Sequence, residues 1–176
     1  MMNTIQELKN ALRTVPNFPK PGINFVDITP VLSNMDLLKK AVHELSVPFM
    51  DKNITKVVGV ESRGFVMAPM IALELGANFV PVRKEGKLPR QTYSVSYNLE
   101  YGSDVIEMHI DSVKPSDRIL IHDDVLATGG TCAAVEDLVD QSGAEIIGMA
   151  FFIELIKLEG RKKFRYQNMI HSVVSV

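Results

Sequence analysis

Apolar and polar residues alternate along the chain in a pattern that predicts strands and helices in turn. Nearly continuous apolar runs, typical of buried strands, are KVVGV (56–60), NFVPV (78–82), RILIH (118–122) and AEIIGMAFFIEL (144–155). Apolar residues at helical spacing occupy 3–14, 37–49, 66–75 and 129–141. This alternation predicts an α/β fold in which a mostly parallel central sheet carries helices on both faces.

Two segments interrupt the alternation. Residues 15–30 read VPNFPKPGINFVDITP, and the prolines before Ile23 exclude a helix and predict an extended loop. Residues 84–111 begin with a basic stretch and continue with polar–apolar alternation, which predicts the two strands of an inserted hairpin. We expect one domain over residues 1–176, with a helix and loop at 1–34 and the hairpin at 84–111.

Composition and charge narrow the classes of function. A net charge of −2, from 19 basic and 21 acidic residues, argues against a nucleic-acid binder that relies on bulk positive charge. No apolar run approaches the length of a membrane span, and the N-terminus lacks the apolar run of a signal peptide. A single cysteine cannot form an internal disulfide, which agrees with a reducing compartment. We therefore expect a cytoplasmic protein that partners neither nucleic acid nor a membrane.

The candidate chemistry concentrates in residues 119–131, ILIHDDVLATGGT. A strand that turns through glycines into a helix exposes backbone amides at the helix N-terminus, where an anion such as phosphate is favoured. No lysine follows the glycines, so the common phosphate loop with a clamping lysine is excluded. Asp123 and Asp124 would repel phosphate, which leaves ribose hydroxyls or a magnesium ion as their targets. An ordinary strand-to-helix turn with a side-chain cap is the alternative.

A second motif, ESRGF at 61–65, directly follows the predicted strand KVVGV. Charged groups at the end of a buried strand are costly unless they face a ligand cleft. The amides of this turn and Arg63 could hold a pyrophosphate. Alternatively, Ser62 is an ordinary N-cap and Arg63 a solvated charge.

A third motif, RKEGKLP at 83–89, places three cations after the predicted strand NFVPV. Arg83, Lys84 and Lys87 would neutralise the charge that grows on a diphosphate leaving group. The alternative is a solvated run of charges.

Two aromatic segments complete the candidate site. In the hairpin, Glu100 could act as a general acid or base under a lid, and Tyr101 either closes that lid or stacks on a neighbouring strand. In the proline-bounded loop, Phe25 could be a platform for a planar base, although a role in the core is the simpler interpretation.

Neither cysteine nor histidine points to further chemistry. Cys132 follows the glycine loop and could be catalytic, but an apolar filler in the first helical turn is the preferred interpretation. The four histidines show no paired spacing and have no companion cysteines, so no zinc site is predicted; they are His43, His109, His122 and His171.

Six segments together resemble the adenine phosphoribosyltransferases, a family of type I phosphoribosyltransferases. They are FPKPGINFVDITP, VVGVESRGF, VPVRKEGKLP, SYNLEYGSD, ILIHDDVLATGGT and ELIKLEGRKKF, and they follow in the family's order over nearly the whole chain. The resemblance implies the type I fold and a reaction in which adenine and phosphoribosyl pyrophosphate give AMP and pyrophosphate in purine salvage. It also implies a homodimer and Mg²⁺, held mainly through the substrate, with Asp123 or Asp124 as candidate protein ligands.

The resemblance further implies roles by matching position. The ribose hydroxyls would be held by Asp123 and Asp124, and the 5′-phosphate by Ala127, Thr128, Gly129, Gly130 and Thr131. Pyrophosphate would be bound by Glu61 and Ser62 through a cis peptide, by Arg63, and by Arg83, Lys84 and Lys87, the last across subunits in similar enzymes. Adenine would lie between Phe25 and Leu155 and be read by the main chain at Val26. The catalytic candidates would be Arg63, Glu100 as the base near N7 and N9, and Tyr101 as the residue that closes the site.

Three positions depart from the family pattern. Val26 stands where many relatives carry a basic residue. The change is harmless if the base is recognised through main-chain groups, and it weakens base affinity if it is not. Arg90 often corresponds to glycine and would stiffen the entry to the lid or add a charge. His122 replaces an apolar strand residue, and its ring needs a hydrogen-bond partner.

Two rival functions stay open at this stage. One is a phosphoribosyltransferase for another base, such as xanthine or hypoxanthine. The other is a regulator that uses the phosphoribosyl pyrophosphate loop as a sensor. Such regulators usually need a DNA-binding segment or a basic face, and the sequence offers neither.

Overall fold

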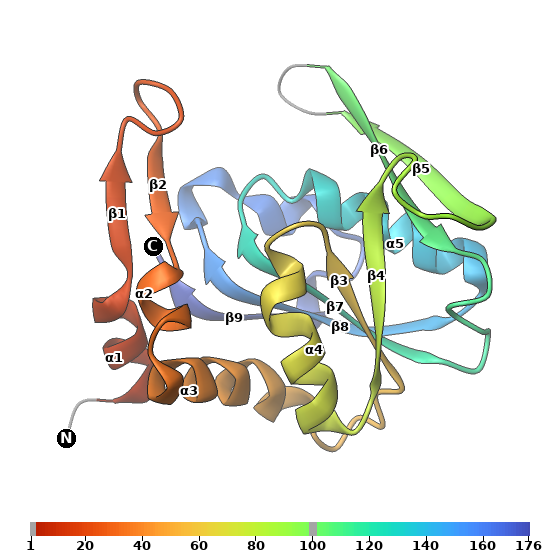
Figure 1. The fold of residues 1–176 in the computed structure, drawn as a ribbon, viewed down its shortest axis with the longest axis horizontal. Helices are drawn as coiled ribbons and strands as arrows, with labels where there is room; N and C mark the ends of the chain where they lie inside the picture. Colours follow the sequence, from red (N-terminus) through yellow and green to blue (C-terminus); the bar gives the residue numbers. More distant parts are fainter. Residues whose placement is uncertain (1–2, 99–101) are drawn as a thin grey trace.

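A computed structural model describes residues 3–98 and 102–176 and shows a central sheet between two layers of helices (Figure 1). The strands are β1 (Arg13–Pro16), β2 (Asn24–Asp27), β3 (Lys56–Val60), β4 (Asn78–Lys84), β5 (Thr92–Asn98), β6 (Ser103–His109), β7 (Arg118–Leu126), β8 (Glu145–Glu154) and β9 (Ile170–Ser175). The α-helices are α1 (Thr4–Ala11), α2 (Thr29–Leu32), α3 (Met35–Ser46), α4 (Gly64–Leu75) and α5 (Gly130–Ser142). Short 3-10 helices are η1 (Val47–Phe49), η2 (Ile156–Leu158), η3 (Gly160–Lys163) and η4 (Gln167–Met169).

The seven-stranded sheet has the order β5-β6-β4-β3-β7-β8-β9. The five strands β4, β3, β7, β8 and β9 lie side by side and pair in parallel. Strand β6 pairs antiparallel with both β4 and β5. The predicted α/β fold with a mostly parallel sheet and an inserted hairpin is confirmed. In Figure 1 the β1–β2 and β5–β6 pairs project from the same side of the molecule. It is the side at which the parallel strands end and ligands bind in open α/β sheets.

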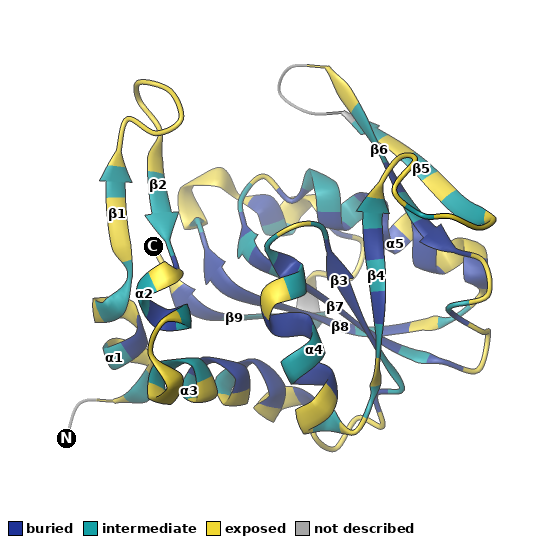
Figure 2. Ribbon diagram, viewed as in Figure 1, coloured by how far each residue is buried: buried dark blue, intermediate teal, exposed yellow. Residues whose placement is uncertain are grey.

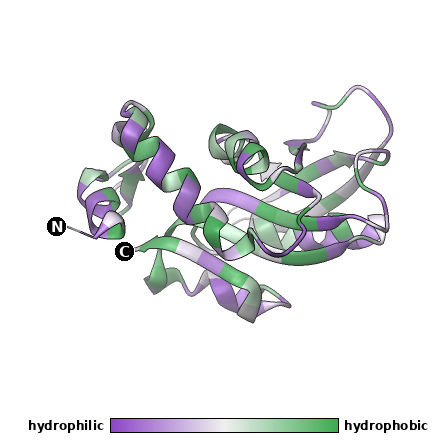
Figure 3. Ribbon diagram, turned by 90° about the horizontal axis from the view of Figure 1, so that it is seen from below, coloured by the Kyte–Doolittle hydropathy of each residue, from purple (hydrophilic) through white to green (hydrophobic). Residues whose placement is uncertain are grey.

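The hydrophobic core has two parts, one on each face of the sheet. Successive residues of β3 show the division, because Val57 packs with α3 and α4 while Val58 packs with the apolar residues of α5. Figure 2 shows the inner strands as the most buried segments, and Figure 3 shows hydrophobic residues along the same strands. Burial on both faces explains why these strands read as continuous apolar runs.

Several elements differ from the sequence-based expectation, β4 among them, because it continues through Arg83 to Lys84. The segment predicted as a loop contains β1 and β2, which pair antiparallel as a small separate sheet with Val15 opposite Phe25. The N-terminal helix ends at Ala11, since Leu12 is already extended. The strand predicted to end at His122 continues to Leu126, because its ladder with β8 extends to the ends of both strands. The edge strand β9 was not predicted.

Helix α4 ends at the glycine expected from the sequence. This residue, Gly76, has a φ of 65°, the left-handed conformation of a helix C-cap. Within residues 3–98 and 102–176, no helix is both long and apolar enough to cross a membrane.

Candidate active site

The turn between β7 and α5 forms a small cavity of about 70 Å³. It is lined by Asp123, Val125, Leu126, Ala127, Thr128, Gly129, Gly130, Thr131, Cys132 and Phe151. All five residues predicted to wrap a phosphate therefore lie on one surface together with one of the two acids.

The N-terminus of α5 is built to receive an anion. Gly129 is the N-cap residue with φ of 79°, and within the described chain no side chain caps this end of the helix. The alternative of an ordinary side-chain cap is therefore wrong for this turn. Backbone amides of the first helical turn lack intrahelical acceptors, and the helix dipole adds positive potential there. The turn can hold a phosphate through its main chain.

The two acids have different surroundings. Asp123 lines the cavity, whereas Asp124 is almost completely buried and its Oδ2 lies 3.0 Å from Nε of Arg63. Burial raises the pKa of both carboxyl groups; the charge of Asp124 raises that of Asp123 further, and Arg63 opposes the rise for both. Adjacent acids of this kind favour ligands that satisfy both, such as a diol or a divalent cation.

The ESRGF motif forms the turn between β3 and α4. The peptide between Glu61 and Ser62 is cis, as the resemblance implied. The N-cap position of α4 is Arg63, and no side-chain cap hydrogen bond is present among the residues described here. The interpretation of Ser62 as an N-cap is therefore wrong.

Glu61 joins the ESRGF motif to the basic segment at the end of β4. Its carboxylate accepts hydrogen bonds from Nε and Nη2 of Arg83 at 3.1 and 3.3 Å, and from the main-chain N–H of Lys84 at 3.1 Å. The pKa of Glu61 is lowered, mainly by its hydrogen bonds with Arg83. Glu61 thus fixes the guanidinium of Arg83 beside the turn.

The other two cations of the segment are placed by the hairpin and by a turn. Nζ of Lys84 lies 3.0 Å from Oδ2 of Asp104 on β6. The main chain of Lys87 donates to the carbonyl of Lys84 and accepts from Arg83. The structure therefore brings all three predicted cations to the end of β4, two of them already in ion pairs.

Phe25 lies next to Arg63 rather than in either core. The Cζ atom of Arg63 is 5.0 Å from the centre of the Phe25 ring, and Phe18 meets the same ring edge-on at 5.4 Å. Phe25 is only partly buried, so its interpretation as a core residue is wrong. Arg63 also contacts Asp124. Its guanidinium therefore connects the turn at residues 61–65 with Phe25 on one side and Asp124 on the other.

The two other predicted base contacts are partly buried. Val26 in β2 and Leu155, directly after β8, pack at the margin of the core on the α3–α4 face. The N–H of Leu155 donates to the carbonyl of Leu126 at 2.9 Å. This hydrogen bond holds Leu155 beside the start of the turn formed by residues 127–131.

The hairpin is present, but its two predicted catalytic residues, Glu100 and Tyr101, lie outside the described residues. Sequence reasoning missed Tyr97 in β5, whose side chain lies close to that of Thr131 in the turn at residues 127–131. Burial raises the pKa of Tyr97, and the side chain of Thr131 opposes that rise. Tyr97 thus lies where the hairpin meets this turn.

The remaining singled-out residues have structural explanations. Arg90 forms an ion pair with Asp111 across the base of the hairpin. Cys132 is buried in the core on the α5 face, and burial raises the pKa of its thiol, as expected of an apolar filler. His122 is fully buried; its Nδ1 lies 2.9 Å from the carbonyl of Ala150, whereas its Nε2 has no hydrogen-bond partner among the described residues.

Buried His122 predicts acid sensitivity of the fold. Burial lowers the pKa of His122 from 6.5 to about 4, so the folded chain stays neutral where the unfolded chain is protonated. The stability that neutral, buried His122 allows is therefore fully present above pH 6.5, and this part of the free energy of unfolding is lost as the pH falls toward 4. We expect this residue alone to cost about 2 kcal/mol of the free energy of unfolding between pH 7.5 and 5.

The measurement is urea denaturation of the wild type and His122→Gln at both pH values. Glutamine keeps a donor for the Ala150 carbonyl but does not titrate in this range. An equal loss of stability in the two proteins would assign the acid sensitivity to other groups.

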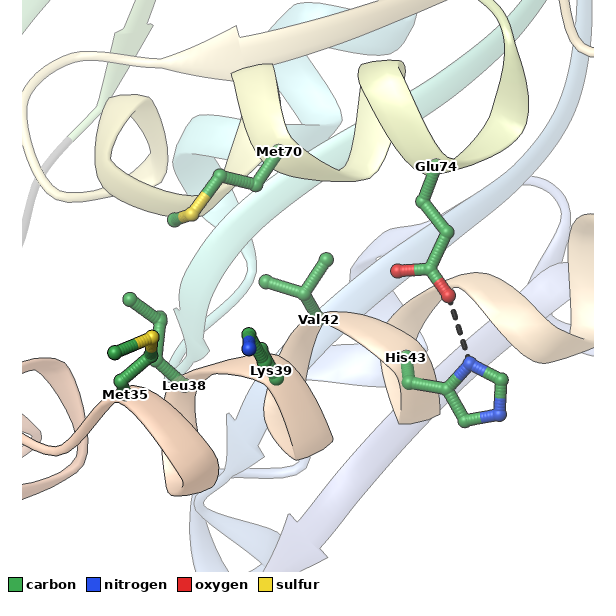
Figure 4. A pocket seen from close by; sticks show the side chains of 7 residues that line it. All are labelled: Met35, Leu38, Lys39, Val42, His43, Met70 and Glu74. Atoms are coloured by element: carbon green, nitrogen blue, oxygen red, sulfur yellow. Dashed lines mark hydrogen bonds and ion pairs between the residues drawn. The ribbon is translucent and has the colours of Figure 1, made fainter.

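A larger cavity of about 560 Å³ lies elsewhere, between α3 and α4 (Figure 4). It is lined by Met35, Leu38, Lys39, Val42, His43, Met70 and Glu74. Nδ1 of His43 lies 2.7 Å from Oε1 of Glu74, within hydrogen-bond distance. None of the predicted site residues lines this mostly apolar cavity, so size alone does not identify the functional site.

Comparison with known families and structures agrees with the site. Residues 31–176 match the model of the phosphoribosyl transferase domain. The adenine phosphoribosyltransferase of Carboxydothermus hydrogenoformans is 49% identical over 95% of this chain and 98% of its own length.

Solved structures are similar over the full chain. The adenine phosphoribosyltransferase from Rhodothermus marinus superposes with a TM-score of 0.94 and 55% identity, covering 98% of each chain. The enzyme from Saccharomyces cerevisiae, solved with adenine and an imino-altritol bisphosphate, gives a TM-score of 0.92 and 40% identity, covering 97% of this chain and 98% of its own.

Proposed function

The chain belongs to the adenine phosphoribosyltransferases of the phosphoribosyl transferase domain family, and on that premise we propose how its residues perform the reaction. The phosphoribosyl group passes from phosphoribosyl pyrophosphate to adenine, giving AMP and pyrophosphate in purine salvage. The observation that carries this proposal is the position of Arg63, whose guanidinium contacts both Asp124 and the ring of Phe25. Binding groups for sugar, leaving group and base therefore adjoin one another.

The phosphoribosyl group is held at two points. The main chain of residues 127–131 and the hydroxyls of Thr128 and Thr131 bind the 5′-phosphate. Asp123 and Asp124 accept hydrogen bonds from the ribose hydroxyls. Binding at both ends orients the anomeric carbon for displacement without a covalent enzyme intermediate.

Leaving-group stabilisation supplies much of the catalysis. As the bond from the anomeric carbon to the pyrophosphate oxygen breaks, positive charge develops on the sugar and negative charge on pyrophosphate. Arg63 and the Glu61–Ser62 peptide, with Arg83, Lys84 and Lys87, bind that growing negative charge. The contact of Glu61 with Arg83 orients the guanidinium for this task.

Adenine binds on the other side of Arg63. Phe25 and Leu155 enclose its two faces, and the main chain at Val26 recognises its amino edge. Glu100 is the proposed base near N7 and N9, and Tyr101 closes over the site with the hairpin. Closure excludes water, which would otherwise hydrolyse the activated sugar.

The acids fit a magnesium ion bound with the substrate. Carboxylate oxygens are suitable ligands for Mg²⁺, but among the described residues no three acidic, histidine or cysteine side chains gather as a metal site. As the resemblance implies, the ion would be held mainly through the substrate, with Asp123 or Asp124 contributing. When bound, the ion neutralises charge on the leaving group.

A homodimer, a cytoplasmic location and a single domain over residues 1–176 are proposed from family membership. Lys87 would then reach pyrophosphate across the subunit interface.

The decisive experiment is incubation of the pure protein with adenine, phosphoribosyl pyrophosphate and Mg²⁺, with AMP and pyrophosphate followed by chromatography. Parallel reactions with hypoxanthine and xanthine test the choice of base. AMP as the main product is expected. Preferential formation of IMP or XMP would replace the proposed base, and absence of any nucleotide would refute the transferase activity.

A further inference from the structure

The segment after β8 folds back against the phosphate turn, main chain against main chain. A Cβ atom added to Gly129 would lie 2.4 Å from the carbonyl oxygen of Gly160, and one added to Gly160 would lie 2.2 Å from the carbonyl oxygen of Ala127. Both values are far below any real contact, so the two backbones touch where only glycine fits. The turn that holds the 5′-phosphate is thus supported from behind by Gly160.

Arg161, the next residue, holds this support in place. Its Nε and Nη2 donate to the two carboxylate oxygens of Glu154, each at 2.6 Å. Its Nη1 donates to the carbonyl of Ile170 at 2.9 Å, and Nη2 also donates to Oγ of Ser172 at 3.2 Å. One side chain therefore ties the segment to the end of β8 and to β9.

The geometry of these contacts makes Arg161 hard to replace. The pair with Glu154 is two-pronged, and a lysine cannot reproduce it together with the contacts to β9. Glu154 is 8% exposed, and Arg161, the largest cause, lowers its pKa. Loss of Arg161 would leave a nearly buried carboxylate without its counter-charge and would free the segment at Gly160.

We propose that Arg161 is a positioning residue that sets the shape of the 5′-phosphate turn through the contact of Gly160 with Gly129. The inference rests on the proposed function, because it names a residue that tunes the same site without touching substrate. Displacement of a preorganised binding turn by about an ångström is enough to weaken its ligand strongly.

The test compares Arg161→Gln with Arg118→Gln. Arg118 serves as the control, because its side chain is 36% exposed against 37% for Arg161 and it also bonds one carboxylate, of Glu145, and one carbonyl, of Lys52. Unlike Glu154, Glu145 is exposed, so Arg118→Gln leaves no buried charge unpaired and the double variant below completes the comparison. It lies at the start of β7, at the opposite end of that strand from the phosphate turn. Dissociation constants for ribose 5-phosphate and for pyrophosphate are measured by calorimetry for both variants and the wild type.

Arg161→Gln is expected to weaken ribose 5-phosphate binding by about tenfold or more and to leave pyrophosphate binding within about twofold of the wild type. Arg118→Gln is expected to change neither constant. If Arg161→Gln does not fold, the double variant Arg161→Gln/Glu154→Gln, which removes the stranded charge, is measured in its place with the same expectation. Unchanged ribose 5-phosphate binding, or equal weakening of both ligands, would overturn the inference.

The proposed function is judged separately by AMP formation in the wild type. A wild type that binds ribose 5-phosphate but forms no AMP would refute the transferase reaction and leave the comparison of variants valid. A wild type that does not bind ribose 5-phosphate would overturn both.

Discussion

Gly129→Ala is expected to lower kcat/KM for phosphoribosyl pyrophosphate by about 100-fold while the chain still folds. Two effects combine at this residue. Its φ of 79° is unfavourable for alanine, and the new Cβ would lie 2.4 Å from the carbonyl oxygen of Gly160. Relief of that clash must move the turn or the segment behind it, so the amides no longer converge on the phosphate.

Gly143→Ala separates the two effects. Gly143 ends the same helix with φ of 74°, but its added Cβ would meet Pro115 Cγ at an ordinary 3.6 Å. Both variants should lose about 1 kcal/mol of stability from the positive φ. Gly129→Ala should lose more than this because of its clash with Gly160, and only Gly129→Ala should lose activity. Activity is measured by steady-state kinetics and stability by urea denaturation for both variants. A similar loss of kcat/KM in Gly129→Ala and Gly143→Ala would contradict the role assigned to the turn at residues 127–131.

Arg63→Gln is expected to lower kcat by about 100-fold to 1000-fold, because it removes a fixed charge from the departing pyrophosphate. It also removes the group that holds down the pKa of Asp124. The pKa of Asp124 therefore rises, the carboxylate becomes protonated at higher pH, and activity begins to fall at a higher pH than in the wild type.

The pH profile of kcat/KM gives this prediction a second readout. Arg90→Gln serves as the control, since Arg90 pairs with exposed Asp111 at the base of the hairpin. It should leave both the rate and the acidic limb unchanged. A wild-type acidic limb in Arg63→Gln would show that Arg63 does not govern the ionisation of Asp124 in the working enzyme.

Strands β3, β4, β7 and β8 could be predicted from the sequence because burial on both faces leaves a local mark, the continuous apolar run. The glycine turn before α5 was predictable for a similar reason, since its chemistry lies within 13 successive residues, 119–131. The Glu61–Ser62–Arg63 turn and the cations at the end of β4 were located by position in the alternating order.

What sequence reasoning missed depends on contacts between distant segments. The pairing of β1 with β2 is hidden by prolines that argue against regular structure, and β9 is a short edge strand. Gly160 and Arg161 lie in a charged stretch that reads as solvated surface, and only the fold brings them against Gly129 and Glu154. The pattern of apolar and polar residues within one segment does not show which distant segments will contact it in the fold.

The ion pair between Glu61 and Arg83 has a consequence for the end of the catalytic cycle. A guanidinium that already donates to a carboxylate gains less free energy from an arriving diphosphate than an unpaired one would. When pyrophosphate departs, Glu61 can immediately resume the hydrogen bonds that the product gives up. In the proposed mechanism, the pair would thus limit product inhibition and promote rapid regeneration of the vacant enzyme.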